Sequence, residues 1–424
     1  DGGGGPVDPE PVTCGRSGDS LEGIGLTSDG MLVCFDGDSP ADEWMLGSIT
    51  GLEGEPAVEM VNGVQVYRLP LRRRQKRGFG SQLLEYLSFF VLVFFKLLVL
   101  YPGRRHATVQ AHNLPYFLIF SALIPKLAGA RLILDIHDIM PEFMAARTGK
   151  GMHSLPVRLT ILQERLSCRF ADYVITVTDL WRERLIQRGV RADKVGVVMN
   201  LADERIFSPR PIEQRPRRAN DRFTLIYHGA FKRHYGLDVL IHAAALARQQ
   251  APELMVILQG SGEYAQQMET MLSELDLTEH VRINNFLLQA ADLPDLIYQA
   301  DVGVVPNYED VFTGELLPTK LLEFAALGVP VIAARTRVIS SYFDDRMLRF
   351  FTPGDARSLA AAIMEAYQQR DRLADQAQEL RRFTGRYNWS NMSRQYVDMI
   401  DRLSLRSGQN IAVEEARAQE GGSR

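Results

Sequence analysis

Short β-rich runs alternate with longer helical runs along most of this chain, and this alternation constrains the fold more than any other feature. In the first half we expect helices near 115–129, 155–170 and 179–189, and strands at 64–69, 108–111, 131–136, 172–177 and 194–198. The second half repeats the pattern, with strands at 223–228, 254–258, 281–285, 301–306, 329–334 and 347–351, a helix at 237–248, and helices from 355 to 405. Such alternation is typical of parallel sheets covered by helices on both faces. The chain is therefore predicted to be an α/β protein with two doubly wound, Rossmann-like domains.

A polar stretch rich in proline and arginine separates the two halves. We interpret it as an interdomain linker. The predicted organisation is a poorly ordered or atypical amino terminus (1–29), a first domain (30–207), the linker (208–221), a second domain (222–385), a carboxyl-terminal helix (386–406) and a tail (407–424).

Composition supports two ordinary globular cores and argues against two other classes of protein. The 424 residues are 46% hydrophobic and 24% charged, which suffices for two domains. A formal net charge of −4 gives no case for nucleic-acid binding, which needs a basic surface. Three scattered cysteines form neither a disulfide framework nor a zinc site.

The most informative motif is Glu315-Leu-Leu-Pro-Thr-Lys-Leu-Leu-Glu323. Pro318 is expected as the first residue of a helix, so the amides of Thr319 and Lys320 would point outward and form a diphosphate site with the Lys320 charge. Glu323 lies one turn deeper on the Thr319 face and could accept hydrogen bonds from two ribose hydroxyls. Glu315 would precede the helix and face the transferred sugar. The alternative is an ordinary capped helix with surface acids.

Two glutamates with seven residues between them, followed by Gly-Val-Pro-Val-Ile, resemble the signature of the retaining family 4 glycosyltransferases. Three further passages are similar to that family, in its order: 135–142 (Asp-Ile-His-Asp-Ile-Met-Pro-Glu), 198–207 (Val-Met-Asn-Leu-Ala-Asp-Glu-Arg-Ile-Phe) and 227–236 (Tyr-His-Gly-Ala-Phe-Lys-Arg-His-Tyr-Gly). The resemblance covers about residues 60–405. It implies a GT-B fold of two facing Rossmann-like domains, with a carboxyl-terminal helix returning to the first.

The resemblance also implies a retaining transfer from a UDP- or GDP-sugar without a metal ion or other cofactor. Protein cations and backbone amides would then stabilise the departing nucleotide diphosphate. The family often places an arginine after the loop glycine Gly229 and a lysine before the second glycine, whereas this chain has Ala230 and Tyr235. Lys232 and Arg233 are expected to substitute from inside the loop as catalytic cations. A solvated basic turn is the alternative.

Several residues just after predicted strands complete the expected site, because doubly wound sheets bind ligands beyond the carboxyl ends of their strands. By resemblance, His137 contacts the donor sugar and is catalytic; a structural histidine bonded to Asp138 is the alternative. On the acceptor side we expect His112, Asn113 and Asp138. The backbones of Gly229 and Gly260 are expected to approach the nucleotide.

A basic cluster (72–77) precedes an apolar run from Leu83 to Tyr101. The run is about long enough to span a bilayer, but Glu85 and Lys96 interrupt it. We expect a helix that lies in the interface of an anionic membrane, with an ordinary buried helix and a true span as alternatives.

These features predict a glycosyltransferase of polysaccharide or glycoconjugate biosynthesis that uses a lipid-linked or glycan acceptor. The enzyme would be cytoplasmic and peripheral on the inner face of the membrane. A nucleotide-sugar epimerase of similar fold is one alternative, and an inactive binding or scaffold protein is the other.

Overall fold

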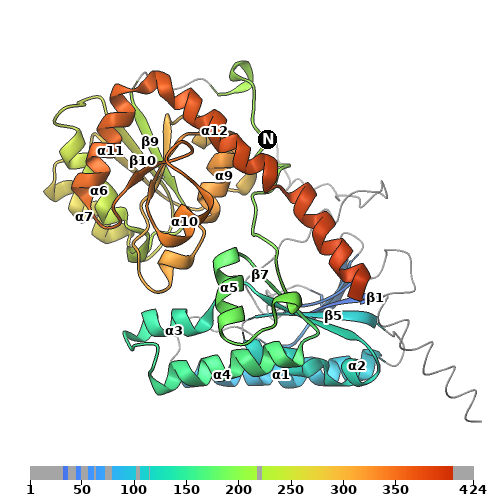
Figure 1. The fold of residues 1–424 in the computed structure, drawn as a ribbon. Helices are drawn as coiled ribbons and strands as arrows, with labels where there is room; N and C mark the ends of the chain where they lie inside the picture. Colours follow the sequence, from blue (N-terminus) through green and yellow to red (C-terminus); the bar gives the residue numbers. More distant parts are fainter. Residues whose placement is uncertain are drawn as a thin grey trace, which may run out of the picture. The chain divides into compact units, whose positions relative to one another are not determined.

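The computed structural model describes residues 32–36, 44–48, 56–61, 64–71, 79–101, 106–113, 115–216 and 222–403. The predictions for 1–29, 407–424 and the basic cluster at 72–77 lie outside these ranges. The chain divides into two compact units (Figure 1). The first holds residues up to Met144, Gly151–Met199 and the chain from Ser393, and the second holds Ala145–Lys150 and Asn200–Met392.

In the described part of the first unit, the strands form one sheet in the order β3-β4-β2-β1-β5-β6-β7-β8. Their bounds are β1 (Leu32–Asp36), β2 (Trp44–Ser48), β3 (Val58–Val61), β4 (Val64–Arg68), β5 (His106–His112), β6 (Arg131–Ile136), β7 (Tyr173–Thr176) and β8 (Val195–Val197). Strands β5 to β8 pair in parallel, as expected, with His112 opposite Asp135. This parallel half places the carboxyl ends of β5 and β6 side by side.

The amino-terminal half of this sheet corrects the prediction. Strand β1 runs antiparallel to both β2 and β5, and β3 runs antiparallel to β4, so the sheet is mixed rather than parallel. The strands before residue 64 were not predicted. They are four or five residues long and lack the helical runs between strands from which the alternation was recognised.

Helices of the first unit are α1 (Phe79–Leu100), η2 (Tyr116–Ala122), α2 (Leu123–Leu127), α3 (Met140–Thr148), α4 (Leu155–Phe170), α5 (Asp179–Gln187) and η3 (Ala192–Lys194). The predicted helix at 115–129 divides into the 3₁₀ segment η2, whose apolar side chains are largely buried, and the short α-helix α2. Both α1 and α4 pack against η2, and Figure 1 shows α1, α2 and α4 along one face of the sheet.

A buried carboxylate network holds α3, α4 and α5 together. Glu142 and Glu164 are each 1% exposed. Arg188 bonds to both, Arg184 donates to Glu142 at 3.1 Å, and Tyr116 donates to Glu164 at 3.1 Å. Burial raises the pKa of Glu164, and Arg188 opposes this rise. The arginine therefore keeps two buried acids compensated.

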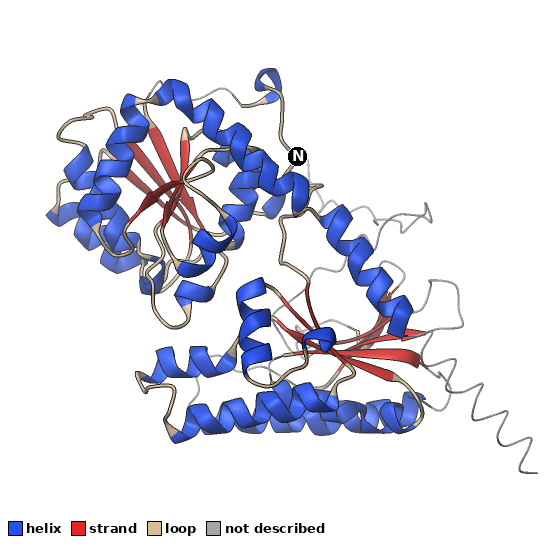
Figure 2. Cartoon of the chain, in the orientation of Figure 1, coloured by secondary structure: helices blue, strands red, loops and turns tan. Residues whose placement is uncertain are grey.

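Strands of the second unit pair in parallel, in the order β11-β10-β9-β12-β13-β14. Their bounds are β9 (Thr224–His228), β10 (Met255–Gly260), β11 (Val281–Asn285), β12 (Val302–Val305), β13 (Val331–Ala334) and β14 (Arg349–Phe351). Residues of β9, β12 and β13 are buried throughout, as expected for central strands of a parallel sheet. Figure 2 shows helices on both faces of this sheet.

The helices of this unit include α6 (Leu237–Ala247), α7 (Ala265–Glu274), α8 (Leu293–Ile297), α9 (Thr319–Leu327), α10 (Arg337–Tyr342), α11 (Ala356–Gln368) and α12 (Leu373–Arg386). Short 3₁₀ turns are η4 (Ile212–Gln214), η5 (Arg233–Tyr235), η6 (Ala290–Asp292), η7 (Thr313–Glu315) and η8 (Arg370–Arg372). The expected linker begins inside this unit, where Arg210 N donates to Tyr298 Oη at 2.9 Å.

After α12 the chain is helical over 389–403. Tyr396, Ile400 and Leu403 from this segment join Ile133 and Ile175 of the first sheet in one apolar cluster. From Ser393 onward this helix therefore belongs to the first unit, in agreement with the predicted return to the first domain.

Candidate active site

The second unit has the strand order of a doubly wound nucleotide-binding sheet, with its switch point between β9 and β12. The loop after β9 carries Gly229 to Gly236, and the segment after β12 leads through Glu315 into α9. Ligands of such sheets bind beyond the carboxyl ends of the strands at the switch point. The topology therefore brings the two motifs singled out in the sequence to one edge.

Glycines allow two loops at this edge to pack tightly. A Cβ on Gly260, whose φ is +152°, would lie 1.9 Å from the Gly229 carbonyl oxygen, and a Cβ on Gly262 would lie 2.3 Å from that of Phe231. Gly229 N donates to Gln259 O at 3.0 Å and Phe231 N to Ser261 O at 2.8 Å. Gly260 therefore has a structural reason to be glycine, in addition to the predicted approach to a nucleotide.

Helix α9 begins one residue later than predicted. Pro318 is the N-cap rather than the first helical residue, and it offers no side-chain hydrogen bond. Leu321 N donates to Pro318 O at 3.0 Å, so the amides of Thr319 and Lys320 precede the helical ladder. The Thr319 side chain is exposed. Both amides are thus suitably placed to bind an anion at this helix start.

Lys320 is the buried cation of the site, with 8% of its surface exposed. Its ammonium lies over the rings of Tyr227 (4.6 Å) and Tyr235 (4.4 Å) and donates to Tyr227 Oη at 3.3 Å. A Cβ on Gly229 would approach its Cε to 3.1 Å. Burial lowers the pKa of Lys320 to about 8, while Glu323 opposes this fall. Because Gly229 has no side chain, the Lys320 side chain has room beside the loop.

Glu323 lies one turn further along α9. Its Oε2 is 3.3 Å from His228 Nε2, and burial raises its pKa to about 7, against the effect of Lys320. Burial and the Lys320 charge hold the pKa of His228 at about 3, so this imidazole is neutral. The carboxylate can accept hydrogen bonds from hydroxyl groups once it is ionised.

Glu315 is buried in η7, before α9, with 6% of its surface exposed. Its Oε1 lies 3.5 Å from Arg337 Nη1, and the Arg337 side chain is 60% exposed. The second oxygen of Glu315 is also buried. Arg337 was not anticipated from the sequence, although it closely follows the predicted strand β13.

Lys232 and Arg233 occupy the exposed outer part of the β9 loop. Lys232 is the N-cap of η5 and has extended backbone dihedrals. Burial raises the pKa of Tyr308 to about 12, and Arg233 partly offsets this effect. The buried cation next to the glycine loop is instead Lys320. The catalytic role of Lys232 and Arg233 stays a prediction.

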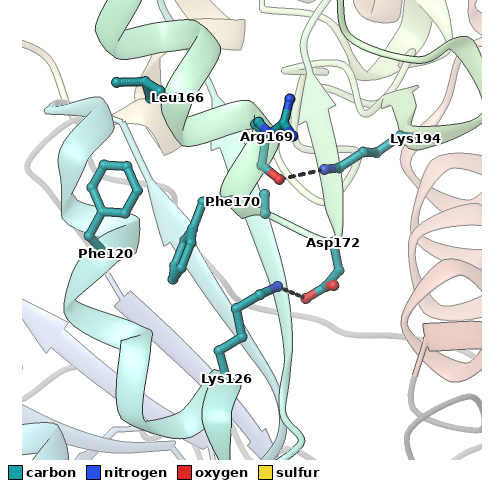
Figure 3. A pocket seen from close by; sticks show the side chains of 8 residues that line it. Phe120, Lys126, Leu166, Arg169, Phe170, Asp172 and Lys194 are labelled. Carbon is teal, nitrogen blue, oxygen red and sulfur yellow. Dashed lines mark hydrogen bonds and ion pairs between the residues drawn. The ribbon is translucent and has the colours of Figure 1, made fainter.

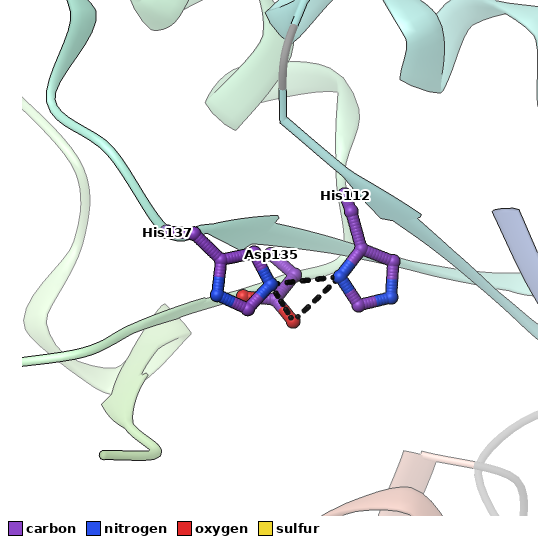
Figure 4. A group of neighbouring side chains, drawn as sticks. All are labelled: His112, Asp135 and His137. Atoms are coloured by element: carbon purple, nitrogen blue, oxygen red, sulfur yellow. Dashed lines mark hydrogen bonds and ion pairs between the residues drawn. The ribbon is translucent and has the colours of Figure 1, made fainter. Parts of the chain in front are cut away.

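In the first unit, β5 and β6 bring His112, Asp135 and His137 together (Figure 4). His112 Nδ1 and His137 Nε2 are 2.8 Å apart, and each lies 3.1 Å from Asp135 Oδ2. Burial would raise the pKa of Asp135, but the two imidazoles hold it well below its usual range. The partners of His137 thus include Asp135 and His112, and burial raises the pKa of the neighbouring Asp138 while the His137 charge opposes this rise.

Gln110 sets the tautomer of His112. Its amide Nε2, which can only donate, lies 3.2 Å from His112 Nε2 and donates to Asp135 at 3.0 Å, while its Oε1 accepts from Tyr396 Oη at 2.6 Å. In the neutral His112 ring, Nε2 is therefore the acceptor and Nδ1 carries the hydrogen.

A metal ion could use His112, Asp135 and His137, whose ligand atoms lie within 4.8 Å of one another. Binding at His112 Nδ1 would require that nitrogen to be unprotonated, which the Gln110 amide opposes. The hydrogen bonds of this cluster are better suited to orienting the His137 ring than to binding a metal ion. Asp135 and Gln110 were missed as site residues, although Gln110/His112 and Asp135/His137 show the two-residue spacing that puts side chains on one face of a strand.

Asn113 joins the loops that follow β5 and β6. Its side chain accepts from His137 N at 2.8 Å and donates to Asp138 O at 2.6 Å. Burial raises the pKa of the half-buried Asp138 carboxyl. Asn113 therefore positions the backbone of His137 and Asp138, and an acceptor contact by either residue stays a prediction.

Two family descriptions match this chain in succession. Residues 32–200 match "Glycosyl transferase 4-like domain" and residues 210–383 match "Glycosyl transferases group 1". The relatives include a chitobiosyldiphosphodolichol beta-mannosyltransferase of Debaryomyces hansenii, 24% identical over 80% of this chain and 79% of the relative. A D-inositol 3-phosphate glycosyltransferase of Thermobispora bispora is 26% identical over 82% and 83% of the two chains.

Two solved structures share the fold. Anabaena Alr3699/HepE in complex with UDP aligns with a TM-score of 0.60 at 18% identity, over 80% of this chain and 86% of that one. Sucrose-phosphate synthase from Thermosynechococcus elongatus aligns with a TM-score of 0.64 at 19% identity, over 84% and 88%. The similarity extends across both units.

Proposed function

Because this chain belongs to the group 1 glycosyltransferases of GT-B fold, we propose that it transfers a sugar, with retention of configuration, from a nucleotide diphosphate donor to a lipid-linked glycan acceptor. Family membership makes it a glycosyltransferase and decides against the epimerase and scaffold alternatives. The retained configuration, the lipid-linked acceptor and the cellular location are the parts that we propose.

The adjacent Lys320 and Glu323 at the start of α9 carry the proposal. A diphosphate placed before the helix would meet the first amides of α9 and the Lys320 ammonium, and the ribose hydroxyls would reach Glu323. Both UDP and GDP contain these groups. HepE, which shares the fold, is named as a UDP complex, and this supports a nucleotide donor of this kind.

We propose that no metal ion takes part in the transfer. The leaving nucleotide diphosphate gains negative charge as the sugar departs, and preorganised cations and amides can stabilise that charge. Lys320 is a buried cation at the proposed nucleotide site, and the exposed Lys232 and Arg233 lie in the loop after β9. Glu315 and His137 are the residues that we propose for contacts with the transferred sugar.

Several observations support an acceptor and a location at the membrane. The name of the Debaryomyces relative refers to chitobiosyldiphosphodolichol, which is a dolichol-linked glycan. Helix α1 has 22 residues and contains an 18-residue apolar window, Leu83–Leu100, with a mean hydropathy of 2.3. By length and composition alone it could cross a bilayer.

The packing of α1 favours a position on the membrane surface over a span. Phe89, Val93 and Leu97 form a buried stripe in the core of the first unit, and Lys96 lies 4.5 Å from the Tyr67 ring centroid. The opposite side exposes a row of apolar residues: Leu84, Leu87, Val91, Phe95 and Leu98. A helix docked in this way can lie in the interface of the cytoplasmic leaflet. We therefore propose a cytoplasmic, peripheral enzyme.

The test is nucleotide release from a panel of UDP- and GDP-sugars, with or without membrane lipid extract, by the full chain and by Lys320→Ala and Glu323→Ala. We expect lipid-dependent release from one donor that both variants lose. The anomeric configuration of the product, determined by NMR, then tests retention. Release by Glu323→Ala at the wild-type rate would refute the assigned nucleotide site, and an inverted anomer would refute retention.

A further inference from the structure

Helix α4 has an outer surface unlike that of an ordinary soluble helix. Its leucines Leu155, Leu159, Leu162 and Leu166 are 68%, 56%, 51% and 51% exposed. At about 100° per residue they fall within an arc of about 60°. A large apolar stripe of this kind on a monomer marks an interaction surface.

The charges on α4 are one-sided. Its exposed charged residues are arginines: Arg158, Arg165 and Arg169. Its glutamate, Glu164, is buried and bonded to Arg188. At about 100° per residue, the arginines form a second stripe directly beside the leucines. This combination of apolar and basic stripes is typical of helices that lie on anionic membranes.

The neighbouring elements extend this surface. Leu123 and Leu127 of α2 are 40% and 76% exposed. Helices α1 and α4 both pack against η2. Helices α1, α2 and α4 lie along one face of the sheet (Figure 1). We call the exposed side of α2 and α4 the α2/α4 face. It adds a second apolar surface to the one on α1.

A pocket of about 670 Å³ opens at the end of the α2/α4 face (Figure 3). Phe120, Phe170 and Leu166 give it apolar walls, and Lys126, Arg169 and Lys194 bring three cations against the single carboxylate of Asp172. That carboxylate already accepts from Lys126 and from Leu132 N, each at 2.8 Å. Three cations and one carboxylate leave an excess of two positive charges at the pocket. Its chemistry thus suits a group with an anionic head and an apolar body.

This pocket is distinct from the candidate sugar site. Its residues Asp172 and Lys194 immediately precede β7 and β8, whereas His112 and His137 lie at the carboxyl ends of β5 and β6. Parallel strands of about six residues separate these two edges by roughly 20 Å. The pocket therefore does not hold the reacting end of an acceptor that is bound at His137.

We propose that the α2/α4 face docks on an anionic bilayer and that the pocket takes the phosphate headgroup of an anionic phospholipid. The inference rests on the peripheral location proposed above, but it does not depend on the transfer reaction. Charge complementarity favours an anionic membrane over a second copy of the chain. A two-fold contact would place the basic α2/α4 faces of two copies against each other, and their positive charges would repel.

The experiment is co-sedimentation of the full chain with vesicles of phosphatidylcholine alone or mixed with phosphatidylglycerol. Lys126→Gln/Arg169→Gln/Lys194→Gln removes the cations of the pocket, and Leu159→Asp/Leu162→Asp disrupts the apolar stripe. The matched controls are Arg282→Gln/Arg346→Gln/Arg372→Gln and Leu246→Asp/Leu287→Asp, which alter exposed residues of the second unit. Binding does not require turnover, so the result is independent of the transferase assay.

We expect the wild type to bind the anionic vesicles preferentially. The triple glutamine variant should bind them about 100-fold more weakly, from roughly fivefold per basic residue at the membrane surface. The leucine variant should lose binding by at least about tenfold, and neither control should change. Equal binding to both kinds of vesicle, or equal losses in variants and controls, would overturn the proposal. A wild-type dimer that the leucine variant dissociates, without vesicle binding, would overturn it in favour of a second copy of the chain.

Discussion

Lys320 and Glu323, which lie one helical turn apart in α9, should make kcat/KM for the donor depend on pH. The size of this dependence can be calculated. A nucleotide diphosphate needs Glu323 ionised to accept from the ribose and Lys320 protonated to bind phosphate. The pKa of Glu323 is raised to about 7 and that of Lys320 is lowered to about 8. The required form is therefore lost as pH falls through 7 and as pH rises through 8.

The magnitude follows from these two values. About 60% of the free enzyme holds the required form at pH 7.5, and about 9% holds it at pH 6 or pH 9. We therefore expect kcat/KM for the donor to fall about sixfold from the optimum to either pH. Because kcat/KM reports the ionisations of the free enzyme, the measurement needs no knowledge of the bound state.

Glu323→Gln isolates the acidic limb. Its kcat/KM should no longer fall between pH 7.5 and pH 6, while the alkaline limb should remain and move to lower pH, because Glu323 supports the charge of Lys320. At the optimum we expect a loss of about 10- to 100-fold, from charged hydrogen bonds of roughly 1.5–3 kcal/mol.

Initial rates of nucleotide release at constant ionic strength, with the donor well below KM, give the profile. The exposed Glu274→Gln is the matched control and should keep both limbs. An acidic limb that persists unchanged in Glu323→Gln would refute the assignment of this ionisation to Glu323.

Three further substitutions test other parts of the structure. Gly260→Ala should lower the thermal midpoint and weaken UDP binding, since its φ alone costs about 1–3 kcal/mol and its Cβ meets a carbonyl oxygen, whereas Gly385→Ala, in open space, should not destabilise the chain. Arg188→Met should cost about 3–5 kcal/mol in urea unfolding by leaving two buried acids uncompensated, and the exposed Arg191→Met should leave the urea midpoint unchanged. Asp135→Asn should lower kcat by up to about 100-fold without changing UDP affinity measured by calorimetry, because the proposed nucleotide site lies in the second unit; a weakened UDP affinity would contradict its role in orienting His137.

The sequence by itself determined the class of fold and the position of the helix at which we propose the nucleotide site. Alternating β-rich and helical runs located every parallel strand from β5 onward to within about two residues, because central strands of such sheets are continuous apolar runs. Pro318, expected at the start of a helix, located the beginning of α9 to within one residue. Both signals are local, because a helix face or a buried strand is defined by residues that lie close together in the sequence.

The tertiary structure decided the contacts that join distant segments. Tyr227 and Tyr235 surround Lys320 only because β9 and β12 are neighbours in the sheet, and Gln110 meets Asp135 only through the pairing of β5 with β6. The amino-terminal strands were missed because their pairing directions depend on partners up to about 80 residues away. The leucine stripe of α4 was likewise not recognised, since periodicity shows that a helix has an apolar face but packing alone decides whether that face is buried or exposed.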